Sequence, residues 1–171
     1  MNLLLRTALR GVEVHRAVCS DLRNRGPQTI LLVQGKGRIE KDALVVLTEP
    51  TLAPIYDYLA ARRAEGREAV GEDSPLFASL SNKAYGKPLS IRSVRQIVKD
   101  ALRSAGLDSE RLTTHSLRHT GVTLALLGGA SVQEAQALAR HSSLVTTMRY
   151  AHNLDRVSQA PERFVDSLLD D

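Results

Sequence analysis

The stretch HSSLVTTMRYAH, residues 141–152, places a tyrosine among basic side chains. Tyr150 follows Arg149 and stands between His141 and His152, although the whole chain holds only four Tyr and no Trp. A tyrosine in a helix usually contributes to packing, whereas a phenol beside cationic groups can act on a negatively charged substrate. The residue types alone leave both interpretations of Tyr150 open.

A second basic cluster lies in HSLRHT, residues 115–120. His115, Arg118 and His119 are three and four residues apart, so they share one face of a helix near its start. The helix N-terminus carries partial positive charge and these side chains add to it, which predicts an anion site. A polar cluster on the surface is the plainer alternative.

Two histidines four residues apart also have the spacing of zinc ligands. Ser, Leu and Arg stand between His115 and His119, so the Glu that serves as general base in such sites is missing. The intervening Arg118 would also repel a metal ion. We therefore expect no metal site, and a metal-dependent hydrolase is a minor alternative.

Two weaker signals lie near the N-terminus. In LRTALRGVE, residues 5–13, Arg10 and Glu13 are three apart, a spacing typical of an ion pair on a helix surface. Lys36 lies in GKGRIEKD, a charged turn with two glycines, where a lysine is usually solvated. Neither signal identifies a site by itself.

Taken in order, these residues form a pattern that resembles the catalytic domain of the tyrosine recombinase (phage integrase) family, over about residues 3–157. TALRGVE resembles the family's first arginine box, and QGKGRIEKDALVVL resembles its strand, turn and strand with a lysine. THSLRHTGVT and ARHSSLVTTMRYAH resemble its second box. The catalytic residues implied by the resemblance are Arg10, Lys36, His115, Arg118, His141 and Tyr150.

The resemblance implies site-specific DNA recombination or integration by strand cleavage and rejoining, with no metal ion and no cofactor. Tyr150 would attack a DNA phosphodiester and form a 3′-phosphotyrosine, which keeps the ester energy for rejoining. Arg10 and Arg118 would hold the nonbridging oxygens as charge develops on them. A phenol, with an ordinary pKa of about 10, is a tolerable leaving group and so suits a reversible exchange.

The other implied residues handle protons and hydrogen bonds. By the same resemblance, Lys36 would deliver a proton to the 5′ oxygen, and His115 would assist removal of the phenol proton. His141 would hydrogen-bond a phosphate oxygen. The ordinary histidine pKa of about 6.5 allows either task near neutrality. His119 matches a common family residue but receives no chemical role.

The chain departs from the family pattern in two substitutions and in length. Ala8 and Arg140 stand where the family usually has glycine, and Arg140 would shift a backbone turn or add a phosphate contact. The chain begins nine residues before Arg10. We therefore expect a single catalytic domain, residues 1–171, shortened at its N-terminus and without the family's core-binding domain. A noncatalytic DNA-binding remnant and a type IB topoisomerase-like enzyme stay as alternatives.

The basic residues indicate double-stranded DNA as the partner. Eighteen of the 23 basic residues are Arg, five are Lys, and the net charge is +4. Guanidinium groups fork onto phosphate oxygens, so this bias favours phosphate recognition. Arg92, Arg95 and Lys99 share a face of a predicted helix and, with Arg140, are candidates for contacts with the DNA backbone. A solvated helix face is the alternative for the first three.

The C-terminal tail carries an apolar stripe at Phe164, Val165, Leu168 and Leu169. The stripe either folds back into the core or, as in the family, docks as a C-terminal helix on a neighbouring protomer. The second arrangement would give a homotetramer on DNA.

Cysteine content and hydropathy indicate the compartment. Cys19 is the single cysteine, so an internal disulfide is excluded. The longest apolar run, GVTLALLGGA, is far too short to cross a bilayer, and no signal peptide is recognisable. We expect a cytoplasmic protein without membrane contact, associated with the nucleoid when it is bound to DNA.

The elements that must position these side chains form a mainly α fold with a small antiparallel β-sheet. Two apolar runs around the Lys36 turn predict a hairpin with the lysine near its tip. Ser131 with Glu134 forms a capping box. The expected helices span residues 2–17, 50–65, 91–106, 115–129, 132–140 and 143–151, and the strands span 28–34 and 43–48.

Overall fold

The computed structural model describes residues 1–35 and 37–158 of the chain. Helices predominate and the strands form one small antiparallel sheet, which confirms the predicted fold class. The elements along the chain are α1 (Asn2–Thr7), α2 (Gly11–Arg16), a 3-10 turn (Cys19–Asp21), β1 (Leu22–Arg25), β2 (Gln28–Val33), β3 (Ala43–Leu47), α3 (Glu49–Ala64), α4 (Ile91–Ser104), α5 (Thr114–Leu127), α6 (Val132–Ala139) and α7 (Leu144–Ser158).

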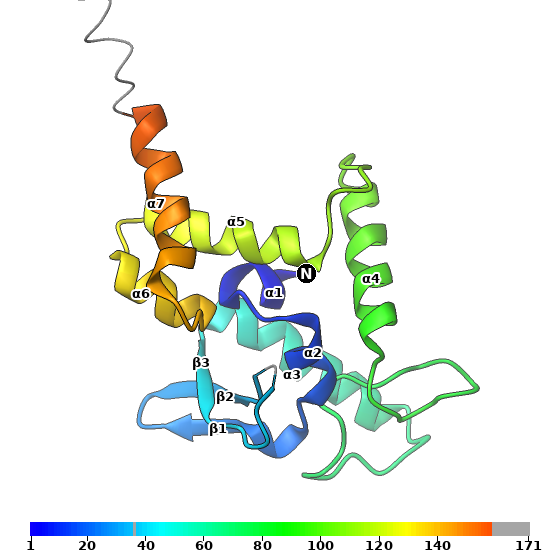
Figure 1. Ribbon diagram of the computed structural model, residues 1–171. Helices are drawn as coiled ribbons and strands as arrows, with labels where there is room; N and C mark the ends of the chain where they lie inside the picture. The colour runs from blue at the N-terminus through cyan, green and yellow to red at the C-terminus, as the bar shows by residue number, and fades with distance from the viewer. Residues whose placement is uncertain (36, 159–171) are drawn as a thin grey trace, which may run out of the picture.

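The short helices α1 and α2 lie at the centre of the molecule (Figure 1). The sheet lies at the lower left of this view, α5, α6 and α7 lie above it, and α4 stands on the right. α1 packs against α5, and α2 packs against α4. The segment that joins α1 to α2 therefore runs from the helix packed on α5 to the helix packed on α4.

Residues 2–17 do not form the single helix that their leucine spacing predicted. The chain turns at Ala8, which adopts the left-handed conformation with φ 50° and ψ 31°, and Arg10 is extended before α2 begins. The break is stabilised because the carbonyl of Ala8 accepts hydrogen bonds from the guanidinium groups of Arg118 and Arg140. These partners come from distant parts of the chain, so local spacing does not reveal the break.

Strand β1 was not predicted either. Three of its four residues are exposed, so the sequence LRNR shows no alternation of apolar and polar side chains. Gly26, with φ 60°, and Pro27 form the two-residue link to β2, in which Arg25 pairs with Gln28. Glycine at the first position of such a link is favoured in tight hairpins. The sheet is thus a three-stranded antiparallel meander in the order β1-β2-β3.

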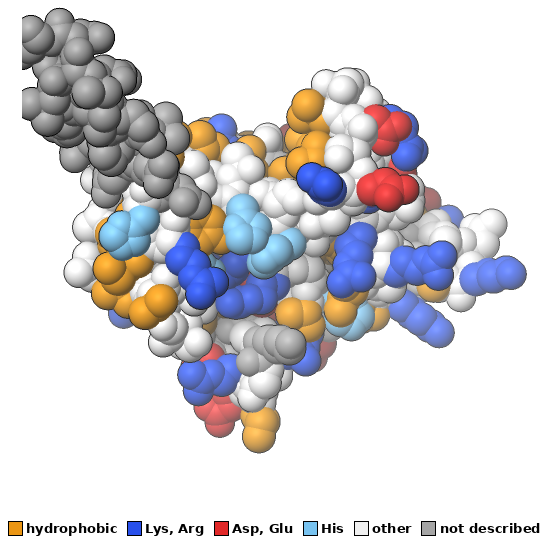
Figure 2. All heavy atoms as spheres, turned by 45° about the horizontal axis from the view of Figure 1, so that its top comes forward, with side chains coloured by type: hydrophobic (Ala, Val, Ile, Leu, Met, Phe, Trp, Pro, Cys, Tyr) orange, Lys and Arg blue, Asp and Glu red, His pale blue; other side chains and the backbone are white. Residues whose placement is uncertain are grey.

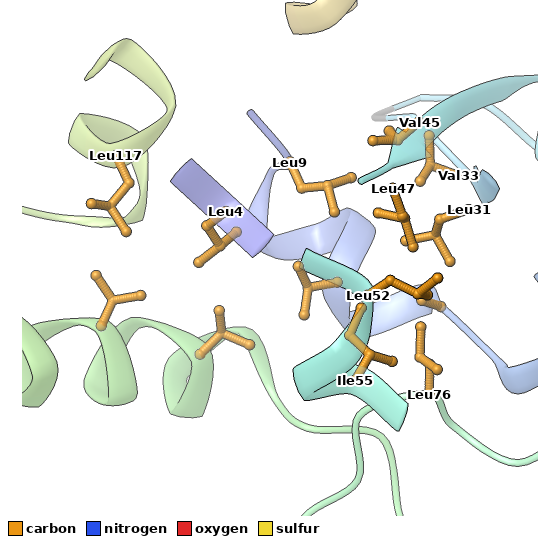
Figure 3. Close-up of a cluster of buried hydrophobic side chains, with 14 of the residues drawn as sticks. Leu4, Leu9, Leu31, Val33, Val45, Leu47, Leu52, Ile55, Leu76 and Leu117 are labelled. Atoms are coloured by element: carbon orange, nitrogen blue, oxygen red, sulfur yellow. The ribbon is translucent and has the colours of Figure 1, made fainter. Parts of the chain in front are cut away.

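The main core lies between the sheet and helices α1, α3, α4 and α5 (Figure 3). Leu9 and Leu31 are completely buried, and Leu4 and Leu117 are nearly so. Burying each such side chain stabilises the fold by about 1.5–3 kcal/mol. Because Leu9 is locked in this core, the backbone of its neighbour Arg10 is fixed as well.

Close packing of α1 on α5 depends on Gly121. A Cβ atom at this position would lie 2.3 Å from the carbonyl oxygen of Leu5, a distance that the two atoms cannot adopt. Glycine here lets the two helices approach closely, and the approach brings the turn at Ala8 within reach of Arg118.

Helix α7 runs to Ser158, well beyond the predicted end at residue 151. Lys36 and the apolar tail residues Phe164, Val165, Leu168 and Leu169 lie outside the described residues. Among the helices that the structure describes, none has the length and apolar character needed to cross a bilayer.

Candidate active site

Basic side chains gather across the middle of one face of the molecule (Figure 2). At the centre of the site, Glu13 on α2 is buried, with no exposure of its side chain. Its carboxylate accepts hydrogen bonds from Arg10 at 3.0 Å and from Arg140 at 2.9 and 3.3 Å, and from the backbone N–H of Arg10 at 2.7 Å. Glu13 therefore holds two guanidinium groups in place, beyond the single ion pair that its spacing predicted.

The charge of Glu13 is maintained by these partners. Burial acts to raise the pKa of the carboxyl group, but the charge and hydrogen bonds of Arg140, and then those of Arg10, outweigh burial and lower the pKa. Glu13 is thus ionised at neutral pH, as a structural partner of the arginines.

The side chain of Arg140 turns inward toward Glu13, and its predicted contact with the DNA backbone stays a prediction. Its side chain is only 11% exposed, and besides Glu13 it donates to the carbonyl oxygens of Ala8 at 3.0 Å and Leu138 at 2.8 Å. The resemblance had allowed a shifted turn or a phosphate contact. The turn is left-handed, with φ 52°, and the guanidinium group binds within the protein.

Arg118 is buried at the junction of three segments. It donates to the carbonyl oxygens of Ala8 and Ala139, which lie before α2 and at the end of α6. Burial and the positive charges of Arg10 and Arg140 lower the pKa of Arg118 to about 10. The group stays charged at neutral pH, and each of its terminal nitrogens carries a second N–H for an incoming anion.

His141 lies in the turn between α6 and α7, and its Nδ1 lies 3.0 Å from the hydroxyl oxygen of Thr147. Partial burial, followed by the charges of Arg118 and Arg10, lowers the pKa of His141 to about 4. The imidazole is therefore neutral at pH 7. A neutral ring still offers one N–H donor to a phosphate oxygen.

The Tyr150 ring lies between two of the histidines. Its centroid is 6.3 Å from that of His141 and 5.2 Å from that of His119, and its hydroxyl is hydrogen-bonded to Nδ1 of His119. Partial burial raises the pKa of the phenol, although the charge of Arg118 acts in the opposite direction. The predicted nucleophile thus lies beside the predicted anion site.

His115 does not contact the phenol directly in the way that its predicted role suggests. Its ring meets the edge of the His119 ring, with centroids 4.2 Å apart and planes at 82°. His119, to which the sequence assigned no role, makes the contact with Tyr150. The signal for it was present in the spacing of HSLRHT, which put both histidines on the same helix face.

Two hollows meet at Arg10. The first, which we call the Glu13 hollow, has a volume of about 440 Å³ and is lined by Arg10, Glu13, Gly35, Arg38, Asp42, Ala43, Arg140, His141 and Ser142. The second, the His115 hollow, has a volume of about 380 Å³ and is lined by Leu9, Arg10, Gly11, Val12, Ile91, Arg95, Thr114, His115 and Arg118.

The loop between β2 and β3 borders the Glu13 hollow on both sides of residue 36. Arg16 donates a hydrogen bond to the carbonyl of Gly35 at 3.2 Å, and the side-chain amide of Gln34 donates to the carbonyls of Arg38 and Ile39 at 2.8 and 2.9 Å. The sequence did not predict that Arg16 and Gln34 hold this loop, because neither residue belongs to a motif.

The three residues predicted to meet DNA from α4 have different surroundings. Arg95 is exposed and lines the His115 hollow. Lys99 donates to the carbonyls of Ser109 and Glu110 at 3.4 and 3.2 Å, so it is engaged with the loop that follows α4. Arg92 is exposed and lies outside both hollows.

The zinc alternative requires several potential metal ligands to lie close together. Within residues 1–35 and 37–158, no three His, Cys, Asp or Glu side chains gather closely enough to hold a metal ion. The site instead collects guanidinium groups.

Residues 1–156 match the sequence model of the phage integrase family. The chain belongs to this family. The resemblance drawn from the motifs is thereby confirmed. The matched range includes the positions of the predicted catalytic residues, whose roles stay predictions.

Curated relatives are named tyrosine recombinases. The chain is 32% identical over 153 residues to tyrosine recombinase XerC of Caldanaerobacter subterraneus subsp. tengcongensis, covering 89% of this chain and 40% of the relative. It is 37% identical over 126 residues to tyrosine recombinase XerD of Caulobacter vibrioides, covering 71% and 38%. The chain thus spans less than half the length of these relatives.

Solved structures share the fold. XerA recombinase matches with a TM-score of 0.72 at 23% identity, over 95% of this chain and 56% of that chain. XerH recombinase, in a post-cleavage complex with palindromic difH substrate, matches with a TM-score of 0.74 at 22% identity, over 94% and 44%.

Proposed function

We propose that this chain carries the cleavage and rejoining chemistry of a site-specific DNA recombinase and acts on double-stranded DNA through a 3′-phosphotyrosine at Tyr150. The observation that carries the proposal is the convergence of Arg10, Arg118 and His141 beside the Tyr150 ring. The names of the family's curated members, tyrosine recombinases, support the same activity.

Arg10 and Arg118 bind the nonbridging oxygens of the scissile phosphate. Charge grows on these oxygens as the phenol attacks, and fixed donors stabilise it without reorganising. Two guanidinium groups supply the positive charge that metal ions supply in other phosphoryl-transfer enzymes, so the proposed reaction needs no metal ion. Losing one such donor raises the activation barrier by about 2.7–4 kcal/mol.

His141 and Lys36 complete the site. With Nδ1 accepting from Thr147, His141 donates its single N–H, at Nε2, to a phosphate oxygen. The arriving anion raises the pKa of the ring by offsetting the neighbouring charges. As the family resemblance implies, Lys36 gives a proton to the 5′ oxygen as the leaving group departs.

Strand exchange requires several protomers on the DNA. We propose a homotetramer in which the C-terminal apolar stripe of one protomer docks on the next, and an association with the nucleoid when DNA is bound. The XerH structure with its palindromic difH substrate, and the Tn1549 transposon integrase structure with transposon right end DNA, support DNA as the partner.

The test uses a library of nicked duplexes with random sequence beside the nick. Cleavage near a nick frees a short fragment, so the covalent protein–DNA link persists and resists detergent. We expect the full chain to form this adduct and Tyr150→Phe to lose it while DNA binding is retained. An adduct of unchanged yield in Tyr150→Phe would reject the assignment of the nucleophile.

A further inference from the structure

The hydroxyl group of Tyr150 is hydrogen-bonded to Nδ1 of His119. In the proposed reaction this hydroxyl oxygen is the reacting atom, and its proton must leave as the bond to phosphorus forms. A general base has to lie within hydrogen-bond reach of the proton that it takes. His119 meets this condition, whereas His115 touches the edge of the His119 ring.

The direction of the hydrogen bond follows from the chemistry of the two groups. A neutral phenol donates its O–H, so Nδ1 accepts and the ring proton is on Nε2. Partial removal from water, followed by the charges of His115 and Arg118, lowers the pKa of His119, so the ring is neutral at pH 7. The titratable and charged groups around the ring, from α5, the α6–α7 turn and α7, are His115, Arg118, His141, Arg149 and Tyr150.

We infer that His119 is a catalytic residue of the proposed reaction, which accepts the proton of Tyr150 as the phenolic oxygen bonds to phosphorus. In the same step the bond between phosphorus and the 5′ oxygen breaks, and the 5′ oxygen takes a proton from Lys36. On rejoining, the 5′ hydroxyl attacks the phosphotyrosine, Lys36 regains its proton, and His119 returns its proton to the departing phenol. His115 acts as a positioning residue for the His119 ring. The inference rests on the proposed function.

The experiment measures single-turnover cleavage by the full chain on the nicked duplex that wild-type protein selects most strongly from the library. His119→Asn places an amide oxygen near the position of Nδ1, which accepts a hydrogen bond but is not basic. We expect cleavage about a hundredfold slower at pH 7, the lower range for loss of a general base. Thermal unfolding of the variant checks that it folds.

The pH profile separates proton transfer from a structural effect. Below the pKa of His119, the wild-type rate falls with pH because a protonated Nδ1 accepts no proton. In His119→Asn the phenol must ionise to solvent, so the rate rises about tenfold per pH unit toward the phenol pKa. The deficit of the variant therefore shrinks as the pH is raised.

A second substrate tests which proton is concerned. A 5′-bridging sulfur in place of the 5′ oxygen leaves without protonation, because thiols have a much lower pKa than alcohols. This substrate should restore cleavage by Lys36→Ala but not by His119→Asn. Full restoration of His119→Asn would place the defect at the leaving group and overturn the inference.

The matched control is His152→Asn, because His152 is exposed on α7 and lies outside the hollow that His119 and Tyr150 line. We expect it to cleave at the wild-type rate. The role of His119 is overturned if His119→Asn cleaves at an unchanged or faster rate, or if its pH profile is unchanged. The role is also overturned if its loss of cleavage rate equals that of His152→Asn. Wild-type protein that forms no adduct overturns the proposed function, and this inference with it.

Discussion

Arg140 occupies a backbone conformation that L side chains rarely adopt, and contacts of its guanidinium group compensate for the strain. Its φ is 52°, where glycine is favoured by about 1–2 kcal/mol. In return, the side chain reaches Glu13 and the carbonyl oxygens around the α1–α2 turn. Glu13 is thereby shared between Arg140 and Arg10, and Arg10 is left 32% exposed at the meeting point of the two hollows.

Arg140→Gly should destabilise the protein although it relieves the backbone strain. Breaking a buried ion pair from one side destabilises by about 3–5 kcal/mol, so we expect a net loss of about 1–4 kcal/mol after the strain is relieved. Chemical denaturation of Arg140→Gly, Glu13→Gln and the double variant measures the coupling. The substitution at 140 should be much less harmful in the Glu13→Gln background, and an equal loss in both backgrounds contradicts the pairing.

The low pKa of His141 predicts a stability that depends on pH. With a pKa of about 4 in the folded state and about 6.5 when unfolded, the ring is neutral in both states above pH 6.5. As the pH falls from about 6.5 to 4, the unfolded chain takes up a proton that the folded protein refuses, so stability declines across this window. Below pH 4 both states are protonated and the loss is complete.

His141→Asn isolates this contribution, because Asn keeps an acceptor for Thr147 and does not titrate. Between pH 7.5 and 5, the thermal midpoint of wild-type protein should fall more than that of His141→Asn. The His119 ring, whose pKa is also lowered, is present in both proteins and cancels. Equal shifts in the two proteins would show that His141 is not held neutral by the fold.

At the scale of elements, short segments packed on one another set the site. α5 carries His115, Arg118 and His119, and α1 packs on α5 so closely that the turn after α1 receives the Arg118 guanidinium group. α6 and α7 pack on α5 in turn and bring in His141 and Tyr150. No single element carries the whole site, so the spacing between helices decides its geometry.

Gly121→Ala should therefore damage both stability and the site. The added Cβ would meet the Leu5 carbonyl oxygen at 2.3 Å, so α1 must move away from α5. Overpacking of this kind destabilises by about 1–3 kcal/mol, or about 2–4 °C per kcal/mol for a chain of this size. Gly71→Ala is the control, because an added Cβ there meets nothing within 4 Å, and a similar loss in the two variants would refute the argument.

At the scale of the whole molecule, the net charge of +4 does not tell how the positive charge is distributed over the surface. Several arginines are paired inside the protein or at its edges: Arg140 with Glu13, and Arg103 with Asp108 at 3.3 Å. Arg95, in contrast, is exposed beside the His115 hollow. Affinity for DNA should therefore depend on which arginines face the site more than on their total number.

Arg95→Ala should weaken binding to any duplex DNA and reduce its dependence on salt. Each lost phosphate contact lowers the slope of log affinity against log salt concentration by about one. Arg103→Ala, on the same helix but paired with acidic residues, should leave the slope unchanged. Fluorescence anisotropy at several salt concentrations measures both, and equal slopes for Arg95→Ala and wild-type protein would exclude a phosphate contact at Arg95.

The sequence by itself determined most of the helices, the strands β2 and β3, and the order of the chemical residues. The helices at 114–127 and 132–139 follow from caps and spacing that lie within each segment, and the capping box of Ser131 and Glu134 is present as predicted. The fold class and the family followed from the same local patterns. Such features depend on residues that are close together in the chain, so the sequence is enough to predict them.

Only the tertiary structure decided the turn at Ala8, the inward path of Arg140 and the contact between His119 and Tyr150. Each depends on partners far apart in the chain, from 31 residues between His119 and Tyr150 to 133 residues between Thr7 and Arg140. Hydrogen bonds and ion pairs form wherever packing brings donors and acceptors together, and spacing along the chain does not encode that distance. The sequence shows which chemical groups the chain carries, but it does not show which of these groups contact one another in the folded protein.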